Sequence, residues 1–133
     1  MIKKMGLNEV LNVAFSVVVT QEDIDDIMVS ALEGGIIHWC KKAEVVGEYL
    51  GEYGSDQISR GGTLKLHVRG SNEVHELTKG KFLKGLEKYV KNPTYSDFLE
   101  FVDHEVRLDT GYADADVADT IIQYALFDEL VFS

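Results

Sequence analysis

The chain has 133 residues, a length typical of one compact domain that can bury a hydrophobic core without a metal or a disulfide. Hydrophobic residues make up 45% of it and charged residues 27%, with a single proline, which excludes a long disordered or polyproline segment. The formal net charge of −10 makes the chain a poor generic binder of nucleic acid, because phosphates need cationic partners.

The first predicted element is a largely buried strand over Glu9–Val19, a segment rich in valine and phenylalanine. A basic start followed by an apolar run is also typical of a secretion signal. Asn8, Glu9 and Asn12 interrupt that run, so the strand is the better interpretation and a cytoplasmic location is expected.

A helix over residues 20–33 follows, with Thr20 as its N-cap, and Gly34-Gly35 as its stop. The next apolar stretch predicts a strand from about Ala43 to Tyr53. Gly47 and Gly51 lie within this strand and suggest a bulge or a close backbone approach.

"TLKLHVR" (Thr63–Arg69) alternates apolar and polar side chains, as a half-buried strand does. "GSN" then predicts a turn and "EVHEL" the returning strand of a hairpin. A three-residue loop pairs Val68 with Val74 on the inner face and places His67 opposite His75 on the outer face. A helix over 79–91, capped by Thr78, comes next.

Three elements are expected in the last third of the chain. A short helix begins at Ser96, a longer one opens at Asp114 or Asp116, and the tail "ELVFS" adds a short edge strand. Together the elements predict a single α+β domain over residues 1–133. We expect an antiparallel sheet of about four strands with three or four helices packed on one face.

Most chemically suggestive groups have simple structural explanations. His67 and His75 are two ligands, too few for a metal site, and the aspartates before the last helix are explained by capping. Cys40, the only cysteine, excludes an internal disulfide and is interpreted as a buried structural residue. No nucleotide-loop, zinc-protease or serine-nucleophile motif is present. We therefore expect no catalytic residue, no metal and no cofactor, and an enzyme is the less favoured class.

The segment "EYGSDQISRGG" (Glu52–Gly62) is the main candidate site, because it is more polar than a turn requires. Its glycines can expose backbone N–H groups to an anion, and Arg60 can donate two hydrogen bonds to a phosphate. The predicted ligand-binding residues are Arg60, Gly61, Gly62, Ser59, Gln57, Ser55, Tyr53, Trp39 and His38. The alternative is a chain reversal capped by Asp56 and Ser59.

Charge is unevenly distributed along the chain. Residues 1–62 contain 5 basic and 10 acidic side chains, residues 63–93 contain 7 and 3, and residues 94–133 contain 1 and 10. An acidic C-terminal third favours either a solvated surface or a face that binds a basic site on another protein.

Four segments resemble small uncharacterised accessory proteins of phages and mobile elements of gut bacteria: Asp23–Cys40, Glu48–Leu66, Glu76–Val90 and Asp109–Phe127. The resemblance implies a possible anti-defence role inside a bacterial host cell. The first hypothesis is a non-enzymatic binder that sequesters a nucleotide-derived immune signal, in a pocket that a homo-oligomer could share. The alternatives are an acidic inhibitor that mimics nucleic acid, as an anti-CRISPR protein does, and a hydrolase of a signalling nucleotide with Asp56 or His38 as its base. Direct binding to nucleic acid or a membrane is not expected.

Overall fold

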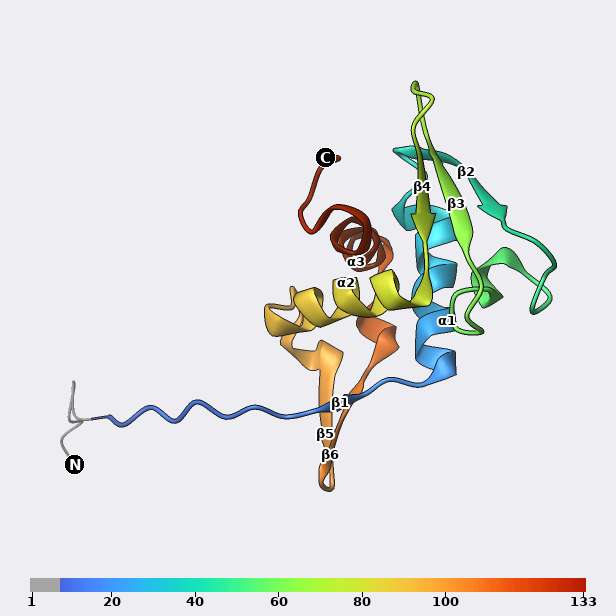
Figure 1. Ribbon diagram of the computed structural model, residues 1–133. Coiled ribbons are helices and arrows are strands. Elements are labelled where there is room, and N and C mark those ends of the chain that lie inside the picture. The colour runs from blue at the N-terminus through green and yellow to red at the C-terminus, as the bar shows by residue number, and fades with distance from the viewer. Residues whose placement is uncertain (1–7) are drawn as a thin grey trace.

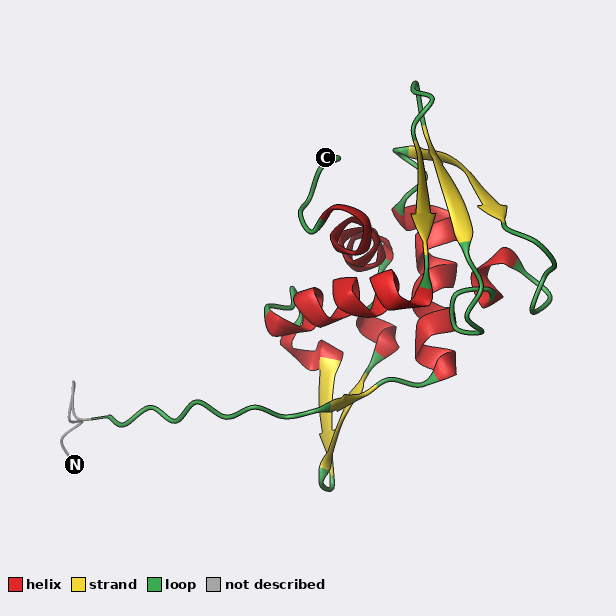
Figure 2. Cartoon of the chain, viewed as in Figure 1, coloured by secondary structure: helices red, strands yellow, loops and turns green. Residues whose placement is uncertain are grey.

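Three α-helices and two small sheets form the fold in the computed structural model, which describes residues 8–133 (Figures 1 and 2). The helices are α1 (Gln21–Ser30), α2 (Lys79–Lys91) and α3 (Ala115–Phe127), and a π-helical turn, Ala31–Gly35, extends α1. Short 3-10 turns lie at Gly54–Asp56, Ser96–Phe98 and Thr110–Tyr112. Residues 1–7, which contain the basic start of the sequence, lie outside the described part of the chain.

The strands divide into two sheets of three. One is antiparallel, in the order β2 (Cys40–Val45), β3 (Leu64–Val68) and β4 (Val74–Leu77). The other has the order β1 (Val17–Val18), β6 (Glu105–Leu108) and β5 (Leu99–Val102), with β1 parallel to β6. The predicted α+β class is confirmed, whereas the expectation of one antiparallel sheet of about four strands is wrong.

One hydrophobic core joins the three helices to the first sheet. Helices α2 and α3 pack so closely at Gly85 that a Cβ there would lie 2.5 Å from the carbonyl oxygen of Ile121. The core includes the fully buried side chains of Ile27, Met28, Leu64, Leu66, Leu77, Phe82, Phe98, Ile121 and Ile122. The predicted cap of α1 is confirmed, since Thr20 and Asp23 form a reciprocal capping box.

The register of the β3–β4 hairpin differs by one residue from the prediction. His67 pairs with Val74, and His75 pairs with Leu66, so the two histidines are not opposite each other. The connection is longer than three residues and contains Gly70 at φ +70°. His75 therefore lies on the same face of the sheet as Leu66, with its ring against Phe127, and Val74 is exposed.

Two other predicted boundaries are wrong. Strand β2 covers Cys40–Val45, not Ala43–Tyr53, with a register irregularity between Cys40 and Lys42. It ends before Gly47, whose φ of +76° turns the chain away from the sheet. The predicted helix at Ser96 is a single 3-10 turn that leads into β5, and Asp103 at φ 53° reverses the chain into β6.

Both ends of the described chain also differ from prediction. Of the expected buried strand over Glu9–Val19, only β1 pairs, and residues 8–16 extend away from the body (Figure 1). The tail that follows α3 forms no strand among the described residues. Gln123 instead binds it through hydrogen bonds to the backbone of Val131 and Phe132.

Candidate functional site

The polar segment 52–62 folds back on itself around Gln57, which is buried. The Gln57 side chain donates to the carbonyl oxygen of Tyr53 at 2.7 Å and accepts from the backbone N–H of Leu50 at 2.7 Å. Both ends of its amide are thereby used inside the protein. Gln57 organises the loop and does not point at a ligand.

Arg60, the predicted anion-binding group, lies among acceptors of its own chain. Its guanidinium donates to the carbonyl oxygen of Asp56 at 3.0 Å and lies 3.5 Å from the carboxylate of Asp25 and 3.7 Å from that of Asp56. Ser59, also buried, donates to Asp25 at 2.6 Å. Two carboxylates next to one guanidinium leave this corner with an excess of negative charge, which opposes phosphate binding.

Gly61 and Gly62 meet the geometric demands of the turn. Gly61 has φ +85°, a region that favours glycine, and its N–H donates to the carbonyl oxygen of Ile58 at 3.1 Å. The N–H of Gly62 donates to the backbone carbonyl oxygen of Gln57 at 2.8 Å, and a Cβ on Gly62 would lie 3.0 Å from that oxygen. These N–H groups, which the predicted anion nest requires, are already bonded to carbonyl oxygens.

Trp39 and His38 lie at the opposite end of β2 from this loop. The Trp39 indole N–H donates to one oxygen of Asp119 at 2.8 Å, and Nε2 of His38 lies 2.9 Å from the other. Strand β2 separates the two places by roughly 20 Å, the length of six extended residues. The structure therefore divides the predicted ligand-binding residues into two groups. No pattern in the sequence marks Asp119, the residue that joins His38 to Trp39.

A hollow of about 490 Å³ lies beside the start of the loop. Tyr53, Gly54 and Ser55 form one wall, and Val29, Leu32 and Glu33 from the end of α1 and the π-helical turn form the other. Two predicted site residues, Tyr53 and Ser55, thus line a concave surface. Arg60 is not part of it, and Glu33 gives it negative charge.

A second hollow, of about 400 Å³, lies where α1 begins beside the β5–β6 hairpin. Its lining contains three carboxylates, those of Asp23, Glu100 and Glu105. The cation in the lining, Arg107, lies 2.7 Å from Glu105 and is paired with it. Asp26 does not line the hollow, but it lies three residues after Asp23 in α1, on the same side of the helix, and accepts a hydrogen bond from Thr110 at 2.9 Å. We call Asp23, Asp26, Glu100 and Glu105 the acidic face.

Sequence reasoning detected the excess of acids but not this arrangement. The segment that begins at Ser96 was expected to be helical, so a β5–β6 hairpin that brings Glu100 opposite Arg107, and both Glu100 and Glu105 into one hollow with Asp23, was not expected. Elsewhere, the shifted pKa values of Glu44 and Cys40 are explained by their immediate surroundings. His67 lies 2.9 Å from Glu44 and its hydrogen bond lowers the pKa of that carboxyl, and burial raises the pKa of the Cys40 thiol. Among residues 8–133, no cluster of three or more potential metal ligands occurs.

Comparisons with known proteins assign no family. No protein-family model matches the chain, and no curated protein or solved structure matches it with statistical significance. In the described part of the chain, no helix has the length and apolar character needed to cross a bilayer.

Proposed function

We propose that this protein is a non-enzymatic binding protein that presents its acidic face to a basic surface on another protein. The observation that carries the proposal is the hollow lined by Asp23, Glu100 and Glu105, whose one arginine is already paired with a glutamate. A concave surface lined by one sign of charge focuses its field and speeds the approach of an oppositely charged partner. The resemblance to phage accessory proteins suggests a nucleic-acid-binding protein of bacterial defence as that partner.

The catalytic alternative has weaker support. His38 and Asp119 have the geometry of a base and its orienting carboxylate. In the described chain, however, no serine, threonine or cysteine side chain hydrogen-bonds to His38. Asp56, the other candidate base, accepts from the Tyr53 N–H at 3.0 Å and pairs with Arg60. Both groups have structural partners that explain them.

The test measures whether the protein blocks DNA binding by purified, guide-loaded CRISPR effector complexes in a gel-shift assay. A double charge reversal, Glu100→Lys with Glu105→Lys, is compared with Glu48→Lys with Glu52→Lys, which reverses two exposed acids that do not line the hollow; Asp23 is left unchanged because it caps α1. We expect inhibition by the wild type and an apparent affinity at least about tenfold weaker for the first variant only. Equal inhibition by both double variants would refute the role of the acidic face.

A second candidate function rests on the hollow at Tyr53. Its aromatic ring and Ser55 could hold the base and sugar of a nucleotide-derived signal, as in the sequestration hypothesis. A thermal-shift panel of cyclic dinucleotides, ADP-ribose derivatives and common nucleotides tests it with the wild type, Tyr53→Ala and Arg60→Ala. A ligand that stabilises the wild type and Arg60→Ala but not Tyr53→Ala supports this site. Stabilisation that is lost only in Arg60→Ala supports the loop nest, and no stabilisation by any ligand excludes sequestration of these compounds.

A further inference from the structure

The N-terminal arm, residues 8–16, is an apolar segment that projects from the body (Figure 1). Val10, Leu11 and Val13 are 80%, 85% and 75% exposed, far more than isolated surface valines and leucines in a compact fold. In an extended chain, Leu11, Val13 and Phe15 fall on one face, and Val10, Asn12, Ala14 and Ser16 on the other, which is the more polar of the two. The arm therefore has the pattern of a half-buried strand whose apolar face lacks a cover.

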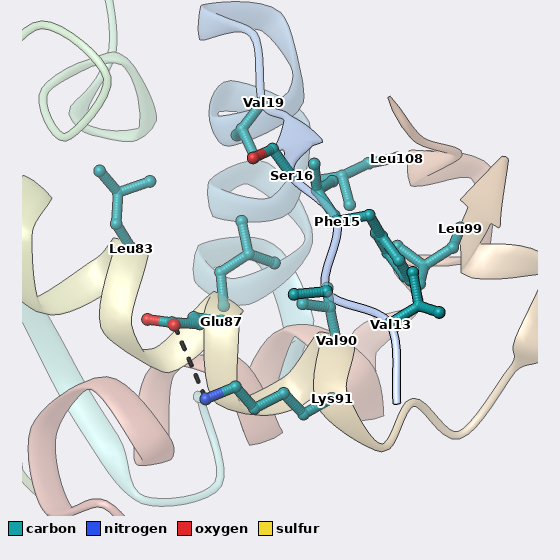
Figure 3. A pocket seen from close by; sticks show the side chains of 13 residues that line it. Val13, Phe15, Ser16, Val19, Leu83, Glu87, Val90, Lys91, Leu99 and Leu108 are labelled. Atoms are coloured by element: carbon teal, nitrogen blue, oxygen red, sulfur yellow. Dashed lines mark ion pairs between the residues drawn. The ribbon is translucent and has the colours of Figure 1, made fainter. Parts of the chain in front are cut away.

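An apolar groove lies at the root of this arm. It has a volume of about 710 Å³ and is lined by the arm, by α2 and by β5–β6 (Figure 3). Leu83, Leu86 and Val90 of α2 form one wall, and Leu99 and Leu108 lie across from them. The pair Glu87–Lys91, 3.7 Å apart, lies along α2 at the groove. Apart from this ion pair, the side chains that the body contributes to the groove are apolar.

We propose that the groove and the arm form a homodimer interface, in which residues 8–12 of each copy lie in the groove of the other while residues 13–16 keep lining the groove of their own chain. Each chain carries both an apolar strand without a cover and an apolar groove that is only partly filled. Reciprocal exchange satisfies both at once in a closed, two-fold arrangement. The proposal is independent of the acidic face, whose residues do not line the groove.

A second copy is favoured over an unrelated partner because every chain supplies both the exposed apolar arm and the apolar groove, and two features mark where an incoming arm would enter. The arm continues directly from β1, which already pairs in parallel with β6, so an incoming arm enters beside an existing strand contact. Phe15 packs edge-on against Phe101 of the same chain, with ring centroids 5.9 Å apart, and Phe101 stays 70% exposed, which leaves apolar surface for a second arm. Strand β5, which carries Phe101, is the outer strand of its sheet and has a free edge.

The test uses the full-length chain and two adjacent substitutions that introduce the same charge. Leu11→Asp places a carboxylate on the apolar face of the arm, and Asn12→Asp places one on the opposite face. Mass is measured by light scattering across a concentration series. We expect a wild-type dimer, a dissociation constant about tenfold to a hundredfold higher for Leu11→Asp, and little change for Asn12→Asp. Both residues are exposed, so neither change endangers folding.

Cross-linking between two different variants shows whose groove the arm occupies. Protein carrying Leu11→Cys is mixed with protein carrying Leu83→Cys, so that a disulfide joining these positions requires two chains. The native Cys40 is buried and gives little background. We expect the mixed disulfide in the mixture. A chain that carries both Leu11→Cys and Leu83→Cys is the control. A wild-type monomer at all concentrations, a dimer equally sensitive to both charge variants, or a disulfide that forms within the control chain but not in the mixture would overturn the proposal.

Discussion

Gln123 of α3 is the residue whose replacement tests the packing of the C-terminal tail most directly. Its side-chain oxygen accepts from the N–H groups of Val131 and Phe132, both at 2.8 Å, and its amide nitrogen donates to the Phe132 carbonyl at 3.1 Å and to Asp119 at 3.0 Å. Gln123 is fully buried. We call the contact between this side chain and residues 131–132 the C-terminal latch.

Gln123→Leu keeps the volume of the side chain but removes all four hydrogen bonds. A net contribution of about 1 kcal/mol for each bond sets an upper range near 4 kcal/mol. The tail can escape part of the penalty by leaving the surface, because Val131 is already half exposed and water can then solvate its backbone. Detachment of the tail also separates Phe132 from Trp39. The centroids of these stacked rings lie 4.8 Å apart, and such a contact contributes about 0.5–1.5 kcal/mol. We expect a destabilisation of about 2–4 kcal/mol.

Chemical denaturation gives the free energy, and Trp39 reports the mechanism because it is the chain's single tryptophan. Its ring is 2% exposed, so release of the tail should shift its emission to longer wavelength. Phe132→Ala should release the same tail. The free energy of unfolding lost by the double variant, Gln123→Leu with Phe132→Ala, should therefore be smaller than the sum of the two single losses by at least about 1 kcal/mol. Additive losses, or native emission in Gln123→Leu, would refute the latch.

Three further outcomes test other contacts. Gly85→Ala forces a Cβ into the α3 backbone and should destabilise the fold by about 1–3 kcal/mol in thermal denaturation, whereas Gly80→Ala, with no atom within 4 Å, should stabilise it by up to about 1 kcal/mol. Cys40, whose thiol pKa is raised by burial, should react with a maleimide at least about tenfold more slowly in the native than in the unfolded protein. The hydrogen bond from His67 lowers the pKa of Glu44, so the ionised carboxylate stabilises the fold at neutral pH, and this stabilisation is lost as the pH falls through the lowered pKa. In Glu44→Gln, the free energy of unfolding measured by chemical denaturation should therefore fall less steeply with decreasing pH over that range.

The parts of the fold that the sequence predicts well depend on neighbouring residues. Helices α1, α2 and α3 were expected within a few residues of their observed bounds, because capping residues such as Thr20, Thr78 and Asp114 lie beside clear helical periods. The alternation over Leu64–Val68 likewise identified β3 and its buried face. Local chemistry and observed structure agree at each of these elements.

The parts that it misses depend on distant partners. The segment from Ser96 to Val102 has apolar spacing that suits one helical turn as well as a short strand, and only pairing with β6 decides for the strand. The β3–β4 register follows from packing His75 against Phe127 of α3, more than 50 residues away. No local pattern contains that contact.

The candidate site was also misjudged because contacts between residues distant in the sequence were unknown. The polar side chains of segment 52–62 suggested a ligand because their partners were unknown, and one partner, Asp25, lies 34 residues before Ser59. Once Asp25 and Asp56 are placed beside Arg60, the polarity of the segment is explained by bonds within the protein. In a small domain, a long irregular connection must satisfy its own backbone and buried polar groups. A polar, glycine-rich segment is therefore evidence for a ligand only to the extent that its donors remain free, and in this loop the amide of Gln57 and the N–H groups of Gly61 and Gly62 do not.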